Sequence, residues 1–325
     1  MRATIIYNPV AGQSDALVWE LQAAARVWIE HGWTVEQYPT QGPGDGTHLA
    51  RIAAARYDDV VIAAGGDGTI NEVVNGLAGT KTALGTLPLG TMNVWVRELG
   101  LPLQPRAAAT ALLASQVRTI DLGRANDRYF LLMAGIGLDA AITAEVRTEE
   151  KRRLGALAYV LRGIEIALRI RGTRTRLVLD GKVVKGRVLM IVVGNSQLYG
   201  GLVKITHRAC IDDGLLDVCV IKGNNFGSAV YHLISIMSRR YSHNPEIAYY
   251  RARTIQVTSR PALPVQVDGD SIGTTPMTFA VAPAALRALM PERLPDDLVQ
   301  RSNEVPQATT VRSLQHLITS LYRRW

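Results

Sequence analysis

The 325-residue sequence has only two cysteines, Cys210 and Cys219. Two thiols cannot build a disulfide framework, and their spacing matches no metal-binding pattern, so we interpret both as plain buried thiols. Aromatic residues are also scarce, at 6%, and only three of them are Phe. A core made from this composition rests mainly on Val, Leu, Ile and Ala.

Long hydrophobic runs are missing as well. The apolar stretch 130–144 is interrupted by Asp139, and no run reaches the roughly 18 residues that a membrane-spanning helix needs. The N-terminus has only a short apolar run before Asn8 and Pro9, which does not resemble a signal peptide. We therefore expect a soluble, cytoplasmic protein that is at most peripheral to a membrane.

Acidic residues are outnumbered by basic ones, with 28 Asp and Glu against 36 Lys and Arg and a pI near 9.6. This excess suits nucleotides, nucleic acid or acidic membrane surfaces as partners, although many cytosolic proteins are equally basic without such a role. Hydrophobic residues make up 47% of the chain, which is enough for the core of one large domain or of two.

The first 90 residues alternate between segments typical of strands and of helices. Strands are predicted at 3–7, 33–38, 59–65 and 82–90, and helices at 15–30, 46–56 and 69–78. Such alternation indicates a parallel sheet with helices on both faces. Ligands of these sheets bind beyond the carboxyl ends of the strands. Four Gly- or Pro-rich loops fall at that edge: NPVAG, PTQGPGDG, GGDGT and PLGTMN.

After about residue 120 the pattern changes to short alternating segments such as RTRLVLDGKVVKG, which surrounds an Asp-Gly turn. These segments predict a second, mostly antiparallel domain, interrupted by helices at about 139–170 and 226–240. Residues 291–310 are polar and contain Pro, which is typical of a linker. The last residues, 311–325, predict an amphipathic helix that could touch a membrane, pack on the sheet or dimerise.

The GGDGT loop, residues 65–69, places glycines where backbone N–H groups can approach a phosphate at the start of a helix. Asp67 could hold Mg2+ through water. The alternative is a tight strand–helix turn capped by Asp67, with Thr69 and Glu72 as a capping box. The chain lacks the P-loop pattern, and no lysine stands in the loop. In PLGTMN, Gly90 and Thr91 offer further donors, and Asn93 could bind nucleotide or cap a helix.

GGDGTINEVVNGL, followed about 20 residues later by LPLGTMN, resembles the diacylglycerol kinase catalytic-domain family, which includes bacterial lipid kinases related to sphingosine and ceramide kinases. GGDGT alone is shared with NAD kinases and, more loosely, phosphofructokinases, whereas the second motif favours lipid kinases. NPVAG, GDGTHLA, NSQLYGG, DDGLLDV and VQVDGD are further matches, in the same order, between residue 5 and about residue 282.

The resemblance implies an α/β fold with an N-terminal NAD kinase- and phosphofructokinase-like parallel-sheet domain and a C-terminal, mostly antiparallel β-sandwich. We expect the nucleotide-binding domain at 1–122, completed by a segment after 282, and the lipid-substrate sandwich at 123–282. A C-terminal helix, the linker and the amphipathic tail would fill 283–325.

The resemblance and the loop chemistry together give candidates for ATP binding. They are Asn8, Pro9, Val10, Ala11, Gly12, Thr40, Gly65, Gly66, Asp67, Gly68, Thr69, Ile70, Asn71, Glu72, Gly90, Thr91 and Asn93. Bacterial members also imply a structural Mg2+ site formed by the Asp213 carboxylate and the backbone carbonyls of Cys210 and Leu215. Oxygen ligands suit Mg2+. The alternative for this segment is a simple β-turn.

The general base implied by the resemblance is Asp270, because the family carries a glutamate in its D-G-E pattern and this chain reads Asp268-Gly269-Asp270. Asp270 is one methylene shorter, and a base must lie within about 3 Å of its proton. The alternative is that DGD is only a hairpin turn. Val94 replaces an aspartate that many members carry, which leaves Asp67 and Asp270 as the main acidic groups.

Basic residues gather in the second domain, where a basic amphipathic helix could lie on an anionic membrane. They are Arg147, Lys151, Arg152, Arg153, Arg162, Arg169, Arg171, Arg174 and Arg176. The alternative is a solvated face. Nucleic acid is disfavoured, because there is no recognised module and little aromatic interleaving. GIGLDA, 135–140, fits a wall of the acceptor cleft better than a dinucleotide site, and the six histidines show no metal spacing.

The sequence therefore predicts phosphoryl transfer from ATP, with Mg2+, to a lipid hydroxyl, most of all that of diacylglycerol, by a protein peripheral to the membrane. Other acceptors, namely a sphingoid base, a different lipid alcohol or NAD, stay open. So does a nucleotide-binding regulator that has lost catalysis, which Val94 and Asp270 motivate. A homodimer is a further open possibility.

Overall fold

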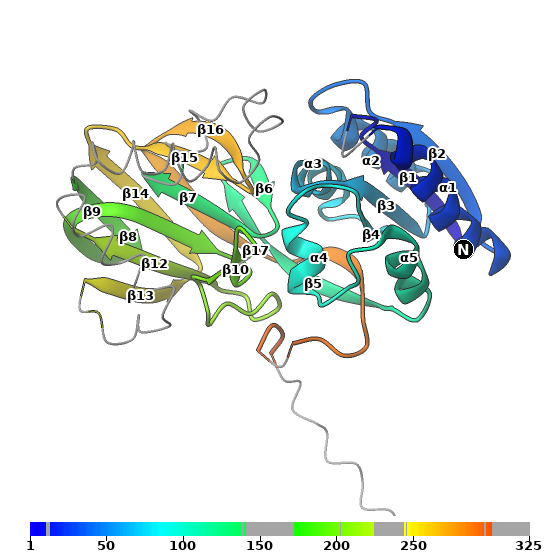
Figure 1. Ribbon diagram of the computed structural model, residues 1–325. Coiled ribbons are helices and arrows are strands. Elements are labelled where there is room, and N and C mark those ends of the chain that lie inside the picture. Colours follow the sequence, from blue (N-terminus) through cyan, green and yellow to red (C-terminus); the bar gives the residue numbers. More distant parts are fainter. Residues whose placement is uncertain are drawn as a thin grey trace, which may run out of the picture.

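The computed structural model describes residues 1–10, 14–137, 140, 172–201, 203–223, 244, 246–295 and 297–300, with backbone only for 14–17. The helices expected at about 139–170 and 226–240, and the tail at 311–325, lie outside these residues. Figure 1 shows two halves side by side, an N-terminal half of strands and helices and a second half built mainly of strands.

The N-terminal half follows the predicted alternation closely. Its elements are β1 (Arg2–Tyr7), α1 (Ser14–Glu30), β2 (Thr34–Pro39), α2 (Asp45–Ala55), β3 (Val60–Gly65), α3 (Asp67–Leu77), β4 (Ala83–Pro88), α4 (Val94–Glu98) and α5 (Pro105–Leu113). The strands are parallel in the order β2-β1-β3-β4. Every residue of β3 and β4 is buried, as the unbroken apolar sequence of a parallel strand predicts.

The direction of the chain reverses within this sheet. From β1 the chain moves outward to β2, and from β2 it returns past β1 to β3 and then continues to β4. Because such crossovers are right-handed, α1 must cover one face and α2 with α3 the other. The packing agrees: α2 lies on α3, and the Trp28 indole of α1 donates to the Ala109 carbonyl of α5 (3.0 Å). The reversal lies between β1 and β3, where such sheets bind ligands.

The second half is antiparallel, as predicted. Its strands are β5 (Gln116–Ala125), β6 (Arg128–Phe130), β7 (Met133–Gly137), β8 (Thr173–Leu179), β9 (Lys182–Gly194), β10 (Leu198–Tyr199), β11 (Val203–Lys204), β12 (Leu216–Lys222), β13 (Ile247–Ala252), β14 (Thr254–Arg260), β15 (Pro264–Val267) and β16 (Asp270–Thr274). The predicted Asp-Gly turn joins β8 to β9, with positive φ at Asp180 (46°) and Gly181 (85°).

The last strand, β17 (Met277–Met290), belongs to both halves. It pairs antiparallel with β14 and β5, and then parallel with β4 at Arg287 and Ala288. The register shifts between Ala282 and Leu286, where Ala284 has a left-handed φ of 51° and donates its N–H to Asp121 Oδ1 (2.7 Å). A strand therefore stands where we expected a helix directly after residue 282.

The core consists of two apolar clusters. One fills the N-terminal half and extends into the second half at β9 and β12, so it joins the two halves. The other lies within the sandwich around Phe130 and Phe279. Of the helices that the structure describes, none combines the length and the apolar character required to span a bilayer.

Candidate active site

The loops after β1 and β2 are tied together at the carboxyl rim of the parallel sheet. The N–H of Thr40 donates to the Tyr7 carbonyl (2.8 Å), and the N–H of Asn8 donates to the Ala64 carbonyl of β3 (3.2 Å). Asn8 therefore lies between the ends of β1 and β3, where the strand order reverses, and Thr40 lies on the other side of β1 at the same rim.

The Asn8 side chain shapes its own loop. Its Oδ1 accepts the N–H of Val10 (3.0 Å), and Pro9 and Val10 are exposed, Val10 by 84%. This turn directs the loop away from the sheet. The next two predicted residues, Ala11 and Gly12, lie outside the described part of the chain.

The two glycine loops pack backbone against backbone. A Cβ placed on Gly90 would lie 2.3 Å from the Cα of Gly66, and one on Gly65 would lie 2.4 Å from Oγ1 of Thr69. Only glycine allows this approach. Because α3 begins at Asp67, the first N–H groups of that helix point to the rim without a partner inside the helix. The rim therefore offers bare main-chain donors suited to an anion.

The side chain of Asn93 closes the PLGTMN loop. Its Oδ1 accepts the N–H of Gly90 (3.0 Å), its Nδ2 donates to the Gly90 carbonyl (2.8 Å), and its own φ is left-handed at 47°. Asn93 thus holds the loop in shape from a buried position, whereas Thr91 beside it is exposed at the rim. Of these candidates, Thr91 is the one whose side chain is open to a ligand.

Asp67 joins the two loops. Its Oδ1 accepts the N–H of Val94, the first residue of α4 (2.8 Å), and burial raises the pKa of this carboxyl above its ordinary value. Val94 carries no carboxylate, but its backbone N–H fixes Asp67 between α3 and α4.

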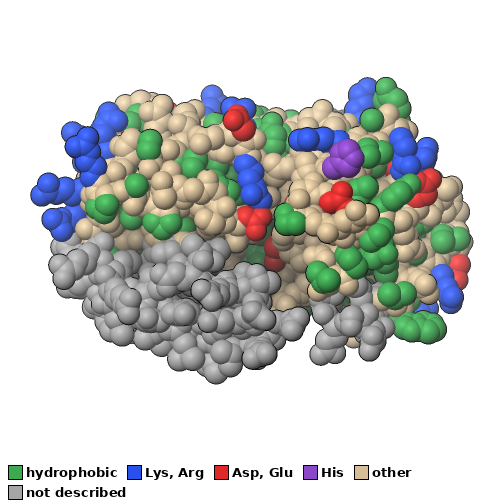
Figure 2. Space-filling model, turned by 90° about the horizontal axis from the view of Figure 1, so that it is seen from above, with side chains coloured by type: hydrophobic (Ala, Val, Ile, Leu, Met, Phe, Trp, Pro, Cys, Tyr) green, Lys and Arg blue, Asp and Glu red, His purple; other side chains and the backbone are tan. Residues whose placement is uncertain are grey.

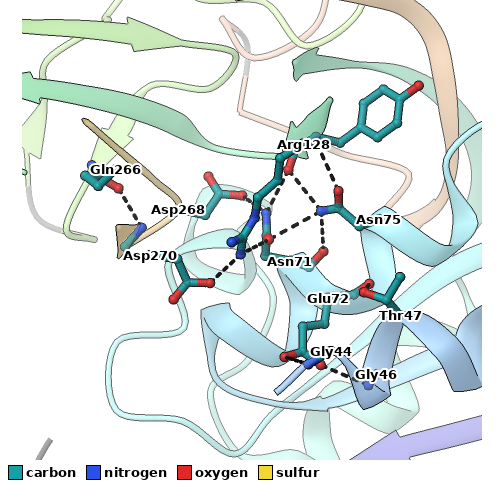
Figure 3. A network of polar contacts seen from close by, with 12 residues as sticks. Gly44, Gly46, Thr47, Asn71, Glu72, Asn75, Arg128, Gln266, Asp268 and Asp270 are labelled. Atoms are coloured by element: carbon teal, nitrogen blue, oxygen red, sulfur yellow. Dashed lines mark hydrogen bonds and ion pairs between the residues drawn. The ribbon is translucent and has the colours of Figure 1, made fainter. Parts of the chain in front are cut away.

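The next residues of α3 turn away from the rim. Ile70 is in the core, 2% exposed. The Glu72 carboxylate accepts the N–H groups of Gly44 (2.8 Å) and Gly46 (2.9 Å) at the start of α2 (Figure 3). The capping box with Thr69 is therefore wrong: Glu72 caps the neighbouring helix, and it orders the PTQGPGDG loop by doing so.

Helix α3 also grips β6, through two asparagines one turn apart. The Nδ2 groups of Asn71 and Asn75 both donate to the Tyr129 carbonyl (3.1 and 2.9 Å), and Asn75 Oδ1 accepts the Tyr129 N–H (2.9 Å) (Figure 3). These contacts fix the strand that follows the N-terminal half against the helix of the GGDGT loop.

Asp268 anchors the hairpin between β15 and β16. Its carboxylate accepts the N–H groups of Leu131 (2.8 Å), Leu132 (2.9 Å) and Met133 (3.0 Å), and the Nδ2 of Asn71 (2.8 Å). Burial raises the pKa of Asp268 to about 6. This residue is a structural anchor, because its acceptors are used within the protein.

Asp270, two residues on, points toward Arg128 and the N-terminal half. Its Oδ2 lies 2.5 Å from Nη2 of Arg128, and the same Nη2 donates to Oδ1 of Asn71 (3.0 Å) (Figure 3). The Asp270 side chain remains 47% exposed. The segment is a hairpin turn, with positive φ at Asp268 (46°) and Gly269 (92°). The turn also brings the Asp270 carboxylate close to α3, with only the Arg128 guanidinium between them.

Two contributors, Asn75 and Arg128, were missed from the sequence, and Asn71 was named only as a nucleotide contact. The i, i+4 spacing of Asn71 and Asn75 after GGDGT was a readable signal for a polar helix face. Arg128 gave no sequence signal, because it stands 142 positions from Asp270 and only the fold brings the two together.

The predicted Mg2+ ligands lie at the start of β12. The Asp213 carboxylate accepts the Leu215 N–H (3.0 Å) at one oxygen and is paired with the Arg251 guanidinium at the other. Cys210 Sγ lies 3.6 Å from the Asp297 carbonyl. In this arrangement the residues do not fit a cation, because Arg251 neutralises the one carboxylate of the set. Over the described part of the chain, no cluster of three or more His, Cys, Asp or Glu could hold a metal.

Comparison with known families decides the identity of this arrangement. The model of the diacylglycerol kinase catalytic domain matches residues 2–125, and that of the YegS C-terminal NAD kinase beta sandwich-like domain matches residues 133–290. The chain belongs to the diacylglycerol kinase catalytic-domain family. Both matched models agree with the predicted fold class, a parallel-sheet domain followed by a sandwich.

Relatives in this family are similar over most of their length. A diacylglycerol kinase of Bacillus subtilis is 32% identical over 300 residues, which cover 91% of this chain and 99% of that protein. One of Staphylococcus aureus is 32% identical over 281 residues, 86% of this chain and 89% of its own. A diacylglycerol kinase structure from Bacillus anthracis has a TM-score of 0.74 and 26% identity, covering 90% of this chain and 97% of that one. Family membership supports an ATP-dependent lipid kinase.

Proposed function

We propose that this family member transfers the γ-phosphoryl group of ATP to the hydroxyl of diacylglycerol, giving phosphatidic acid. The observation that carries the proposal is the contact of Arg128 with both Asn71 and Asp270. It places a half-exposed carboxylate of the second half beside the helix whose N-terminus lies at the glycine rim. Diacylglycerol as the acceptor rests on the names of the relatives.

In this proposal the phosphates of ATP, with their Mg2+, would lie against the first N–H groups of α3 and beside Thr91, since the Gly90 N–H is already bonded to Asn93 Oδ1. Main-chain donors fixed before the substrate arrives need no reorganisation when charge moves in the transition state. Phosphoryl transfer depends mostly on such positioning and electrostatic stabilisation. The Asp67 carboxylate, held in place by the Val94 N–H, would orient the water shell of the metal.

The transfer itself needs one base. The hydroxyl oxygen of the acceptor attacks the γ-phosphorus, the bond from that phosphorus to the bridging oxygen breaks, and ADP leaves with the electron pair. Asp270 takes the hydroxyl proton. Arg128 acts as a positioning residue, because it fixes the direction of the Asp270 carboxylate from the side of α3.

A nucleotide-binding regulator without catalysis is the second candidate, and two residues favour it. Asp270 is shorter than the family glutamate, and Val94 supplies no carboxylate next to Asp67. A kinase for another acceptor, such as a sphingoid base or a different lipid alcohol, keeps the same chemistry and differs only in the pocket.

The test is to incubate purified protein with ATP, Mg2+ and a total lipid extract, and to identify phosphorylated products by mass spectrometry. We expect phosphatidic acid, and none with Asp270→Asn. A different phosphorylated lipid would replace diacylglycerol as the acceptor. Protein that binds ATP with Mg2+ but phosphorylates nothing would establish the regulator.

A further inference from the structure

Three adjacent strands of the second half, β9, β8 and β14, carry a row of arginines across their outer face. Along β8 buried and exposed residues alternate, and Arg174 and Arg176 are exposed. The register places Arg187 of β9 directly opposite Arg174 on one side and Arg260 of β14 directly opposite it on the other. Residues directly opposite in antiparallel strands point to the same face, so three arginines stand side by side.

The next row on the same face is also basic. Lys185 of β9 and Thr258 of β14 flank Arg176. We call the set of five exposed basic residues the arginine face: Arg174, Arg176, Lys185, Arg187 and Arg260. A third row continues it with Val183, Val178 and Gln256, and Val183 is 45% exposed. Nine outward positions thus carry five positive charges and no negative one.

Nothing in the described chain compensates this charge. Like charges directly opposite each other weaken a sheet, and none of the five side chains makes an ion pair or a side-chain hydrogen bond with a residue that the structure describes. Lys and Arg side chains gather at the end of the molecule that lies on the left in Figure 2, the end where Figure 1 places β8 and β9. A repulsive arrangement without an internal partner points to an external anion.

The face is connected to the active site by one short hairpin. Ser259, next to Arg260, lies with its Oγ 2.5 Å from Oγ1 of Thr275, just beyond the end of β16. Asp270 is the first residue of the same strand. Thr275 is five residues from Asp270, a span of about 16 Å along a strand, so docking of the arginine face on a surface also sets how far the Asp270 carboxylate lies from that surface.

We propose that the arginine face docks on an anionic lipid bilayer. The proposal rests on the proposed function in one respect, that the acceptor is a lipid and resides in a membrane. Charge complementarity selects the occupant, since each basic residue near an anionic leaflet strengthens binding about fivefold. The exposed Val183 suits the interface, and none of the nine positions carries the aromatic side chain on which nucleic-acid bases would stack.

The test compares two variants that change the net charge equally. Arg174→Glu with Arg187→Glu reverses two charges on the arginine face, and Arg26→Glu with Arg106→Glu reverses two exposed charges on α1 and α5. Binding is measured by sedimentation with phosphatidylcholine vesicles, one third of whose lipid is replaced by phosphatidylglycerol. We expect the face variant to lose at least about tenfold in partition coefficient, and the control variant to stay within about twofold. Equal losses, or none, would overturn the proposal.

Two further measurements separate this proposal from a folding defect and from the proposed function. Arg174→Thr relieves repulsion with both neighbours, so its melting temperature should equal or exceed that of the wild type while vesicle binding falls; a lower melting temperature with unchanged binding would count against the face. Phosphorylation of diacylglycerol in neutral detergent micelles should not change in the face variant. If no lipid is phosphorylated but the vesicle result holds, membrane docking by the arginine face is supported and the kinase proposal fails.

Binding to a single-stranded oligonucleotide tests the other anionic partner. Charge-dependent binding to the oligonucleotide but not to vesicles would overturn the membrane assignment.

Discussion

The two ends of the parallel sheet satisfy their polar groups in opposite ways. At the amino end, charged side chains satisfy one another: the buried Asp58 carboxylate accepts the Thr4 hydroxyl (2.6 Å) and pairs with Arg2 (3.0 Å) and Arg56 (3.0 Å). At the carboxyl end, two glycine loops pack backbone against backbone, and the side chains of α3 and α4 reach into the second half. We call the amino end closed, because its polar side chains bond to one another, and the carboxyl end open, because its polar side chains bond to the second half.

This difference separates stability from function. The densest ion-pair network described in the N-terminal half lies at the amino end of the sheet, away from the glycine loops. The carboxyl end, where the candidate site lies, is instead marked by glycines and few side chains. Substitutions at the amino end should therefore affect folding alone, and substitutions at the carboxyl end should affect catalysis or the coupling of the halves.

The largest effect is expected for Asp270→Asn at the open end. Removal of the proposed base should lower kcat by about a hundredfold to ten-thousandfold, while the dissociation constant of ATP stays within about twofold, because in the proposal Asp270 contacts the acceptor and not the nucleotide. Steady-state kinetics and calorimetric titration measure the two quantities. Activity within tenfold of the wild type would remove Asp270 from the mechanism.

The next prediction concerns Glu98 of α4, which is 4% exposed and accepts the N–H groups of Gln197 (3.1 Å) and Leu198 (2.7 Å) in the second half. Burial raises its pKa from 4.5 to about 7. Between these values the folded state holds a proton that the unfolded state has lost, so stability falls as the pH rises from about 4.5 to 7.

Glu98→Gln should flatten this dependence. Over the same interval the wild-type free energy of unfolding should decrease by up to about 3 kcal/mol more than that of the variant. Urea denaturation at a series of pH values measures the difference. Parallel curves for the two proteins would show that Glu98 does not titrate in this interval.

At the closed end, Asp58→Ala should reduce the free energy of unfolding by about 2 to 3 kcal/mol, because two guanidinium groups and the Thr4 hydroxyl lose their acceptor. Glu36→Gln in the same network is the matched control, and it should change stability much less because Glu36 is 37% exposed and solvent screens its charge. The kcat of the folded fraction should be unchanged in both, and a fall in kcat would break the separation of the two ends.

Gly90→Ala tests the contact between the two glycine loops. The new Cβ would lie 2.3 Å from the Gly66 Cα, so the loops must separate, and overpacking of this kind costs about 1 to 3 kcal/mol. We expect ATP affinity to fall about tenfold. Gly42→Ala is the control, since a Cβ there meets nothing within 4 Å. Unchanged ATP binding in Gly90→Ala would place the nucleotide elsewhere.

The smallest effect is expected for Arg128→Met, which keeps the bulk and loses the contact with Asp270 and Asn71. kcat should fall about fivefold to tenfold while KM for ATP changes little, and Arg128→Lys should recover part of the loss. Arg124→Met on β5, at an exposed position, serves as the control. Equal changes in kcat and in KM for ATP would assign Arg128 to nucleotide binding.

Most of the fold was predictable, because the buried strands read as continuous apolar segments and each Gly-rich loop marks a strand end. The error after residue 282 has a physical cause. Residues 284–290, AALRALM, have the composition and apolar spacing of a helix, but pairing with β4 and β5 outweighs this local preference. Glu72 shows the same override, since its local capping pattern yields to the N–H groups of Gly44 and Gly46.

The candidate site was predictable where its chemistry is local. The close approach of the loops at Gly66 and Gly90 follows from short motifs. The ion pair of Arg128 with Asp270 does not follow from a short motif. It depends on the hydrogen bonds that Asn75 makes with β6 and on those by which Asp268 holds the β15–β16 hairpin. Arg251 was hidden for the same reason: its position beside Asp213 follows from the register of β13 on β12.

Strand β17 has a mechanical consequence. Because β17 is hydrogen-bonded to strands of both halves, the two halves cannot move independently as domains joined by a flexible linker would. Any tightening around a substrate has to be absorbed as twist and bending within the strand, whose register is irregular around Ala284. Closure around a substrate would then require changes in a few backbone dihedrals of β17 and not rotation of two domains about a flexible linker.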